Sequence, residues 1–391
     1  MSRTAPNLAP FALAYFGFFA YLGSAGPWLT TYQRQLGFDQ TTAGNLMAVF
    51  TLSAIIGGWI AARRADALRG RRKLQRNLSI VAAVASLFWL FVDQPWMALC
   101  VVIVQGACIG PQIPMLDGAT IDALGPERRR YGRVRVWGSI AWGVATLVIG
   151  MVRELDPTAM AIIPLSMAGW LLAFHACTWR LPDTQSPVRS SKPRLDLAAA
   201  FRSPPFVALM LASLLHGIAF SNYEHFSART FEDLGVSPLG VSAILLVGIF
   251  FESLVFWVAP RLLNRWSAIT LATVALLTTA ARWWVTPHIS SFSGFALLQP
   301  THAFTFALWY IAAMHLVSRL VTDEVRTTGQ TLQFTAFAIG MAVGVAAGGA
   351  IRDAQGITTA FHHAALVDLL AVAVLLATAR RFASITPIGS R

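Results

Sequence analysis

The sequence predicts an all-α polytopic membrane protein, with twelve transmembrane helices arranged as two six-helix bundles. Three observations lead to this fold class. The chain of 391 residues is 56% hydrophobic and 12% charged, and this charged fraction is about half that of an average soluble domain. The apolar residues form blocks long enough to cross a bilayer, which takes about 20 residues per helix. Basic residues gather in every second connection between the blocks, as the positive-inside rule describes.

The apolar blocks give the spans in order. The first block begins at Leu8 and is too long for a signal-peptide core. It also lacks a basic start and a small-residue cleavage pattern, so we expect it to remain as the first helix. Glycine and proline inside several blocks are tolerated where neighbouring helices satisfy the freed backbone groups. The predicted spans are residues 8–32, 42–62, 78–93, 96–117, 133–152, 158–179, 204–229, 239–260, 267–287, 291–316, 327–351 and 358–379.

The distribution of charge predicts the orientation of these spans. With both termini in the cytoplasm, the 30 lysine and arginine residues all fall in cytoplasmic segments except Arg34, Arg153, Arg229, Arg352 and the buried Arg282. This pattern explains the net charge of +12 without any nucleic-acid partner. We therefore expect a multi-pass protein of the inner (plasma) membrane, whose partners are the lipid bilayer, a small-molecule substrate and protons.

The longest polar connection divides the chain. Residues 181–203 are rich in proline and serine and form the predicted cytoplasmic linker. Residues 1–180 then make the N-terminal six-helix bundle, and residues 204–391 make the C-terminal one. The segments YGRVRVWGS and DEVRTTGQ open the fifth and eleventh spans at equivalent points of the two halves. Such weak internal symmetry is typical of transporters built from a parallel repeat. We expect the chain to work as a monomer.

The sequence offers little to an enzyme or a metal site. Cys100, Cys108 and Cys177 lie inside apolar blocks, the histidines are scattered over different spans, and no H-E-x-x-H motif occurs. Neither Lys73 nor Lys192 lies in a phosphate-binding loop, so the chain has no ATPase of its own. We expect no cofactor, and transport that is either downhill or coupled to an ion. A membrane-embedded enzyme and a non-transporting membrane sensor remain as alternatives.

The first candidate site joins the fourth and fifth spans. Asp117 follows the helix-bending run GPQIP, and Arg135 opens the next span. Trp142 lies seven residues after Arg135, on the same helix face. A charge at the bilayer centre costs at least about 2.5–3.5 kcal/mol, so these residues are functional candidates. The simple alternatives are a salt bridge between helices, a basic anchor and an interfacial tryptophan. Substrate binding is the sharper interpretation, because an arginine fork can hold a carboxylate or two adjacent hydroxyls.

The second candidate site joins three successive spans of the other half. Glu252, Arg282 and His302 lie inside the eighth, ninth and tenth spans. A static ion pair between the first two is one interpretation. A proton-coupling site is the other, because access to water can shift a buried carboxylate between its charged and neutral forms. Two further residues carry less weight: His216 could line a cavity, and we expect Asp368 to pack against a neighbouring helix.

These features resemble the major facilitator superfamily over nearly the whole chain. The basic loop GWIAARRADALRGRRK is a degraded form of that superfamily's signature. A closer resemblance is to the phenylpropionate permease family and its relatives, the lactose permease-like oligosaccharide/proton symporters. It rests on PQIPMLDGAT and YGRVRVWGSIAW in the first half, and on FFESLVF, AARWWV and PTHAFTF in the second.

The resemblance implies a fold, an activity and residue roles. The fold would be the major facilitator fold, and the activity proton-coupled symport by alternating access, through a cavity between the two bundles. The substrate-binding residues would be Asp117, Arg135, Trp142 and Arg282, and the proton-coupling residues would be Glu252 and His302.

Two departures from the symporter pattern favour the phenylpropionate side. Thr305 stands where the lactose permease-like symporters carry a glutamate one helical turn after the histidine. Gln299 replaces their basic residue three positions before it. We therefore expect import of a phenylpropionate-type aromatic acid, with an oligosaccharide or a nucleoside as the alternative substrate.

Overall fold

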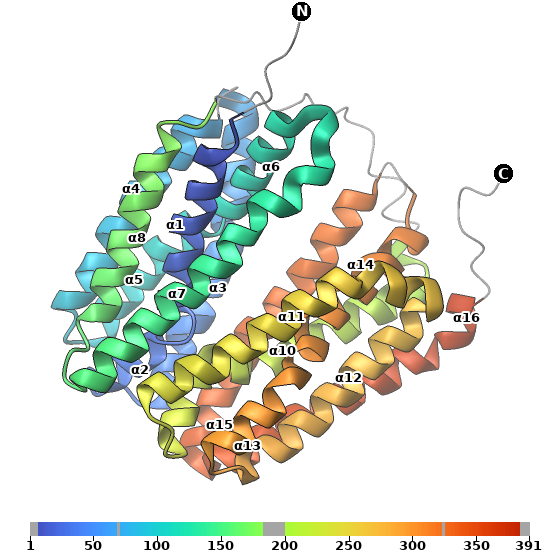
Figure 1. The fold of residues 1–391 in the computed structure, drawn as a ribbon. Helices are drawn as coiled ribbons and strands as arrows, with labels where there is room; N and C mark the ends of the chain where they lie inside the picture. The colour runs from blue at the N-terminus through green and yellow to red at the C-terminus, as the bar shows by residue number, and fades with distance from the viewer. Residues whose placement is uncertain (1–6, 69–70, 183–199, 323–324, 384–391) are drawn as a thin grey trace, which may run out of the picture. The chain divides into compact units, whose positions relative to one another are not determined.

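The structure is a computed structural model that describes residues 7–68, 71–182, 200–322 and 325–383. Within these ranges all regular elements are helices (Figure 1). The chain groups into two compact units. Unit 1 comprises Met1–Arg189 with Ser237–Ser242, and unit 2 comprises Ser190–Val236 with Ala243–Arg391. Most of the predicted linker, residues 183–199, lies outside the described residues.

Unit 1 contains the helices that correspond to the first six predicted spans. A bend of 43° separates its first two helices, which together make one broken span. The helices are α1 Ala9–Ala25, α2 Leu29–Gln35, α3 Gln40–Leu68, α4 Arg71–Phe88, η1 Trp89–Phe91, α5 Pro95–Ile109, α6 Gln112–Leu124, η2 Gly125–Arg130, α7 Tyr131–Leu155 and α8 Ile162–Thr178.

Unit 2 contains the helices of the last six predicted spans, except that the first turn of α11 is grouped with unit 1. The helices are α10 Pro204–Asp233, α11 Pro238–Arg265, α12 Ala268–Val285, η3 Thr286–His288, α13 Phe292–Leu298, η4 Gln299–Thr301, η5 Phe304–Leu308, α14 Trp309–Leu320, α15 Arg326–Ala377 and α16 Ala379–Ala383.

The number of membrane crossings agrees with the prediction. In the described residues, nine helical segments are long and apolar enough to cross a membrane, and some of them join consecutive helices, such as α5 with α6. The bent α1–α2 pair is a tenth candidate. Helix α8 is an apolar helix of 17 residues and supplies the next crossing. Helix α15 has 52 residues, which is more than twice the length needed for one crossing. It is interrupted at Gly356, whose φ of +88° ends one helical segment and starts another. The fold class predicted from the sequence is therefore confirmed.

Glycines set how closely the helices approach within each unit. In unit 1, a Cβ on Gly23 of α1 would lie 2.3 Å from the carbonyl oxygen of Trp142 on α7. In unit 2, a Cβ on Gly340 of α15 would lie 2.0 Å from the carbonyl oxygen of Leu214 on α10. Lipid gives helices no hydrophobic reason to associate, so close van der Waals packing at small residues has to hold them together. The first and fifth spans of each unit, α1 with α7 and α10 with the first part of α15, therefore pack closely in the same way.

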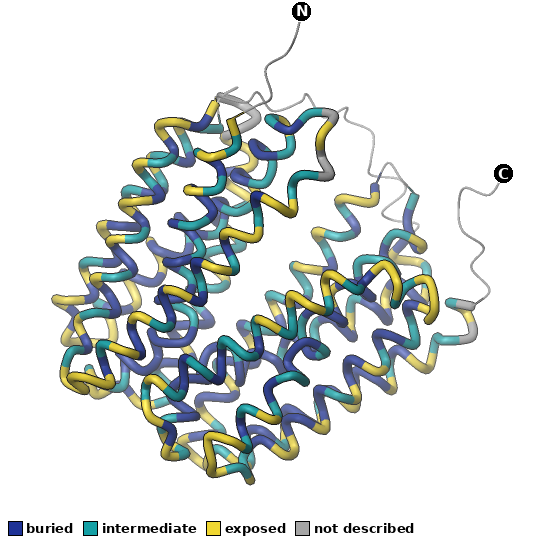
Figure 2. Tube along the Cα trace, viewed as in Figure 1, coloured by how far each residue is buried: buried dark blue, intermediate teal, exposed yellow. Residues whose placement is uncertain are grey.

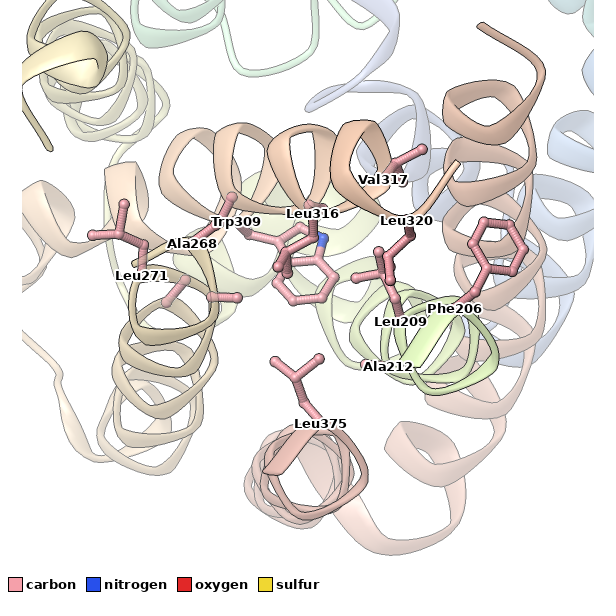
Figure 3. Packing of buried hydrophobic residues seen from close by; sticks show 14 of the residues in the cluster. Phe206, Leu209, Ala212, Ala268, Leu271, Trp309, Leu316, Val317, Leu320 and Leu375 are labelled. Atoms are coloured by element: carbon pink, nitrogen blue, oxygen red, sulfur yellow. The ribbon is translucent and has the colours of Figure 1, made fainter. Parts of the chain in front are cut away.

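Large apolar side chains fill the interior of unit 2. Figure 3 shows part of this cluster, in which Trp309 of α14 lies among leucines of the neighbouring helices. Along the trace, buried and exposed residues alternate on each helix (Figure 2). Many exposed positions carry large apolar residues, such as Phe250, Trp257 and Leu297. Such side chains are expected where a helix faces lipid.

Candidate functional site

Asp117 of α6 lies at the centre of a hydrogen-bonded cluster in unit 1. The hydroxyl of Tyr15 on α1 donates to its Oδ1 at 2.5 Å. The hydroxyl of Tyr131, the first residue of α7, donates to the same oxygen at 2.9 Å. Tyr15 is fully buried, so this carboxylate connects three helices through charge-assisted hydrogen bonds.

Arg135 lies beside this cluster, against aromatic rings. Its Cζ is 3.8 Å from the ring centroid of Phe19 and 5.6 Å from that of Tyr15. Gly138, one turn further along α7, leaves room for this stack, because a Cβ there would lie 2.9 Å from both Arg135 Nη1 and the Phe19 ring. Among the described residues no ion pair joins Arg135 to Asp117. The salt bridge that the sequence allowed is thus replaced by a cation–π stack next to a carboxylate that accepts from two tyrosines.

Trp142 lies at the closest approach of α1 and α7. It is half-buried, and its backbone carbonyl packs against Gly23. One turn further along, the hydroxyl of Thr146 donates to the carbonyl of Gly23 at 2.8 Å. The helix crossing therefore fixes the backbone from which this indole projects.

In unit 2, Glu252 and His302 meet as the sequence suggested. The Oε2 of Glu252 on α11 is 3.6 Å from Nε2 of His302. The other ring nitrogen, Nδ1, is 3.1 Å from the hydroxyl oxygen of Thr305. The imidazole is buried and lies against the rings of Tyr223 and Phe220.

Arg282 of α12 is held by the tenth span instead of by a carboxylate. Its Nη2 donates to Oε1 of Gln299 at 2.7 Å, and its Cζ is 4.6 Å from the ring centroid of Tyr223. The amide nitrogen of Gln299 in turn donates to the Tyr223 hydroxyl at 2.6 Å. The neutral side chain that departs from the symporter pattern is therefore the hydrogen-bond acceptor of this buried arginine. The sequence allowed an ion pair between Glu252 and Arg282, but in the structure Glu252 faces His302 and Arg282 donates to Gln299.

The structure gives His216 and Asp368 a larger role than the sequence suggested. The Nδ1 of His216 on α10 lies 2.8 Å from Oδ1 of Asp368 on α15, and both side chains are 0% exposed. The indole nitrogen of Trp283 on α12 donates to Oδ2 of Asp368 at 3.1 Å. Two ionisable residues in otherwise apolar spans were the available signal. The 152 positions between them in the chain hid the pairing.

The comparison with known proteins decides the family. A model of the MFS_1 like family matches residues 8–363. The chain belongs to this family. In sequence it is 25% identical to the probable 3-phenylpropionic acid transporter of Escherichia coli (strain K12), over 80% of this chain and 83% of that protein. It is 23% identical to the maltose permease of Geobacillus stearothermophilus, over 95% and 94% of the two chains. The lactose permease of Klebsiella oxytoca is 21% identical, over 81% and 78%.

Solved structures show the same fold. The nucleoside transporter NupG is similar with a TM-score of 0.82 at 15% identity, over 95% of this chain and 99% of that one. A bacterial homolog of the human lysosomal transporter Spinster is similar with a TM-score of 0.67 at 13% identity, over 96% and 95%. This MFS_1 like protein is therefore a multi-pass secondary transporter of the major facilitator superfamily.

The tenth span of this MFS_1 like transporter is irregular where its polar residues lie. A 3₁₀ turn at Gln299–Thr301 and a π-helical turn at Phe304–Leu308 interrupt the α-helical pattern between α13 and α14. Single π-helical turns inside helices occur frequently at functional sites. This irregular segment supplies Gln299 to Arg282, His302 to Glu252, and Thr305 to both histidines.

An apolar pocket of about 380 Å³ opens between α11, α12 and η5 of unit 2. It contains none of the candidate polar residues, so it suits an acyl chain better than a charged solute. The pocket is lined by Val255, Val258, Leu262, Trp266, Thr270, Leu271, Val274, Phe304 and Leu308.

In the described part of the chain, no group of three or more His, Cys, Asp or Glu side chains is placed to hold a metal ion.

Proposed function

We propose that this transporter is a proton-coupled symporter of the inner membrane, and that it imports a phenylpropionate-type aromatic acid by alternating access. In this proposal the halves 1–180 and 204–391 are two six-helix bundles joined by residues 181–203, and the chain works as a monomer with both termini in the cytoplasm. Asp117, Arg135, Trp142 and Arg282 contact the substrate. Glu252 and His302 couple its movement to protons.

The stack of Arg135 on Phe19 is the observation that carries the choice of substrate. The guanidinium lies 3.8 Å from the ring centroid, while the neighbouring carboxylate of Asp117 accepts hydrogen bonds from Tyr15 and Tyr131. An aromatic acid matches this arrangement, because its carboxylate can pair with the guanidinium while its ring packs on the aromatic side chains. The likeness to the 3-phenylpropionic acid transporter supports the same choice.

A sugar or a nucleoside is the second candidate, and Asp117 is the reason. Both tyrosine hydroxyls bind its Oδ1, and no hydrogen bond among the described residues reaches its Oδ2. That oxygen could accept from a ribose or glucose hydroxyl, with Trp142 stacking on the ring. The likeness to the maltose permease supports this alternative.

An uptake experiment separates the candidates. Reconstituted vesicles are given labelled 3-phenylpropionate, maltose or uridine, and counterflow is measured for each. We expect counterflow of 3-phenylpropionate. Counterflow of only maltose or uridine would select the second candidate, and saturable binding without counterflow of any would indicate a membrane sensor.

Arg135→Gln tests the binding role of the guanidinium. Loss of a charge-assisted bidentate contact should weaken 3-phenylpropionate binding by roughly 10- to 100-fold, about 1.5–3 kcal/mol. Arg133→Gln is the matched control, since Arg133 is an exposed residue of the same turn and should leave affinity unchanged. Equal losses in the two variants would count against a direct contact. The measurement is substrate-induced stabilisation of the purified protein.

Glu252→Gln tests the coupling role. The variant keeps the shape and polarity of the side chain but cannot release a proton to His302, so accumulation driven by a pH gradient should fall while counterflow persists. The control is Glu127→Gln, which alters an exposed carboxylate paired with Arg130. Accumulation that still follows the gradient in Glu252→Gln would remove this residue from the coupling mechanism.

A further inference from the structure

Thr305 connects two buried histidines and determines which ring nitrogen of each one donates to it. Its backbone carbonyl oxygen lies 2.9 Å from Nε2 of His216. Its hydroxyl donates to the carbonyl of His302 at 2.7 Å, and the same hydroxyl oxygen is 3.1 Å from Nδ1 of His302. One residue of the π-helical turn therefore contacts a ring nitrogen of both histidines, one from α10 and one from its own span.

These contacts determine which nitrogen of each histidine carries a hydrogen. A carbonyl oxygen can only accept, so Nε2 of His216 must donate to Thr305. The hydroxyl hydrogen of Thr305 is already given to a carbonyl, so Nδ1 of His302 must donate to the hydroxyl oxygen. The remaining nitrogens face carboxylates: Nδ1 of His216 faces Asp368, and Nε2 of His302 faces Glu252.

The contact between His216 and Asp368 consequently needs one more proton. At 2.8 Å the two atoms share a hydrogen bond, which requires either a charged imidazole beside a carboxylate or a neutral imidazole beside a carboxylic acid. Removing that single proton leaves two lone pairs facing each other in a site that is 0% exposed on both sides. Such an arrangement is costly, because a buried polar contact without its hydrogen loses the interaction and keeps the desolvation cost.

We infer that the Asp368–His216 pair is a second proton-binding site of this transporter, one that takes up and releases its proton during the transport cycle. The inference rests on the proposed proton-coupled function. Loading adds one proton from water between Nδ1 and Oδ1, and unloading returns it to water, leaving the carboxylate and a neutral imidazole. Trp283 holds Oδ2 of the carboxylate in both states. Thr305 acts as a positioning residue, since it orients both histidines toward their carboxylates.

The surroundings link this pair to the proposed coupling residues Glu252 and His302. From the elements packed against the pair, α12 contributes Arg282, the neighbour of Trp283 in the chain, and the tenth span contributes His302, which faces Glu252 of α11. The proton changes the net charge of the pair between zero and minus one. A change of one charge in this low-dielectric interior is felt by the neighbouring titratable groups, so the two sites should load and unload in a coupled manner.

Two substitutions imitate the two states of the pair. In Asp368→Asn the amide can donate to Nδ1 of His216 and still accept from Trp283, which imitates the loaded state without a mobile proton. In His216→Gln the amide can donate to an ionised Asp368, which imitates the net charge of minus one of the unloaded pair without a mobile proton. Asp353→Asn is the matched control, because Asp353 is an exposed residue of the same helix.

Proton release from the purified full-length protein tests the site without any substrate. The protein is placed in lipid in a weakly buffered solution, at a starting pH above the titration range of exposed carboxylates, whose pKa values are about 4. The pH is then raised, and the released protons are counted. We expect one fewer proton per molecule from Asp368→Asn and from His216→Gln, and the wild-type number from Asp353→Asn. Equal release by the wild type and both variants would overturn the inference.

Transport then tests whether the proton moves within the cycle. With labelled 3-phenylpropionate, Asp368→Asn should keep counterflow but lose about tenfold in accumulation per unit of pH gradient, which corresponds to one coupled proton. Thr305→Ser, which keeps both contacts, should behave as the wild type. Unchanged accumulation in Asp368→Asn would show a static pair and overturn the inference. If even the wild type ignores the gradient, the proposed function fails, and the proton count still decides whether the pair binds a proton.

Discussion

At the scale of single residues, neutral partners surround the charges of Asp117 and Arg282. Asp117 accepts from two tyrosine hydroxyls, and Arg282 donates to an amide and stacks on Tyr223. A buried charge needs hydrogen bonds to offset its lost hydration. Neutral partners supply them without cancelling the charge, as the proposed contacts with a solute or a proton require. A static ion pair would instead have neutralised the charge.

Gln299 gives a direct test of this principle. Its Oε1 accepts from Arg282 at 2.7 Å in a site where both side chains are almost fully buried. Gln299→Lys places a second cation there and removes the acceptor, so it should destabilise the protein by about 3–5 kcal/mol, the cost of an uncompensated buried charge. Gln299→Glu keeps an acceptor and adds an opposite charge, so it should fold. Thermal unfolding in detergent measures the stability of both variants. Equal stability would show that the charge of Arg282 does not act on position 299.

At the scale of helices, hydropathy predicts the spans and leaves their interruptions unresolved. The break between α1 and α2 falls at Gly26-Pro27 and the π-helical turn at Phe304–Leu308 follows Pro300, but both lie inside blocks that remain apolar. The candidate residues on neighbouring spans could be predicted because helical spacing and charge in an apolar block are local signals. The contacts of Tyr15 with Asp117 and of His216 with Asp368 could not, since they depend on helix pairs 102 and 152 positions apart.

Glycine contacts between helices lead to a prediction at this scale. A Cβ on Gly344 of α15 would lie 2.2 Å from the backbone carbonyl oxygen of Ile218 on α10, so the helices would have to separate. Gly344→Ala should therefore cost about 1–3 kcal/mol, the usual cost of overpacking. Gly169→Ala in α8 is the control, because a Cβ there meets nothing within 4 Å and a helical glycine gains about 0.5–1 kcal/mol on becoming alanine. Opposite shifts in thermal unfolding are expected, and a loss of stability in both would refute the packing argument.

At the scale of the whole molecule, three of the four external exceptions to the positive-inside rule have a structural reason. Arg153, Arg229 and Arg352 all fall in predicted external segments, yet each is less than 10% exposed. Arg352 donates to Oδ1 of Asn222 at 2.7 Å, and the Nε of Arg153 donates to the sulfur of Met160. These arginines are internal packing residues of their units. They do not behave as loop charges, so they do not weaken an orientation based on the charges that do lie in loops.

The orientation can be measured with one pair of substitutions. Pro157 lies in the exposed loop between α7 and α8, and Glu127 lies in η2 between α6 and α7. In a background with Cys100, Cys108 and Cys177 replaced by serine, each position is changed to cysteine and treated with a membrane-impermeant maleimide. Because the basic residues near Glu127 should remain in the cytoplasm, intact cells should label Pro157→Cys alone, and permeabilised cells should label both. The reverse pattern would place both termini outside and invert the direction of every transport step proposed above.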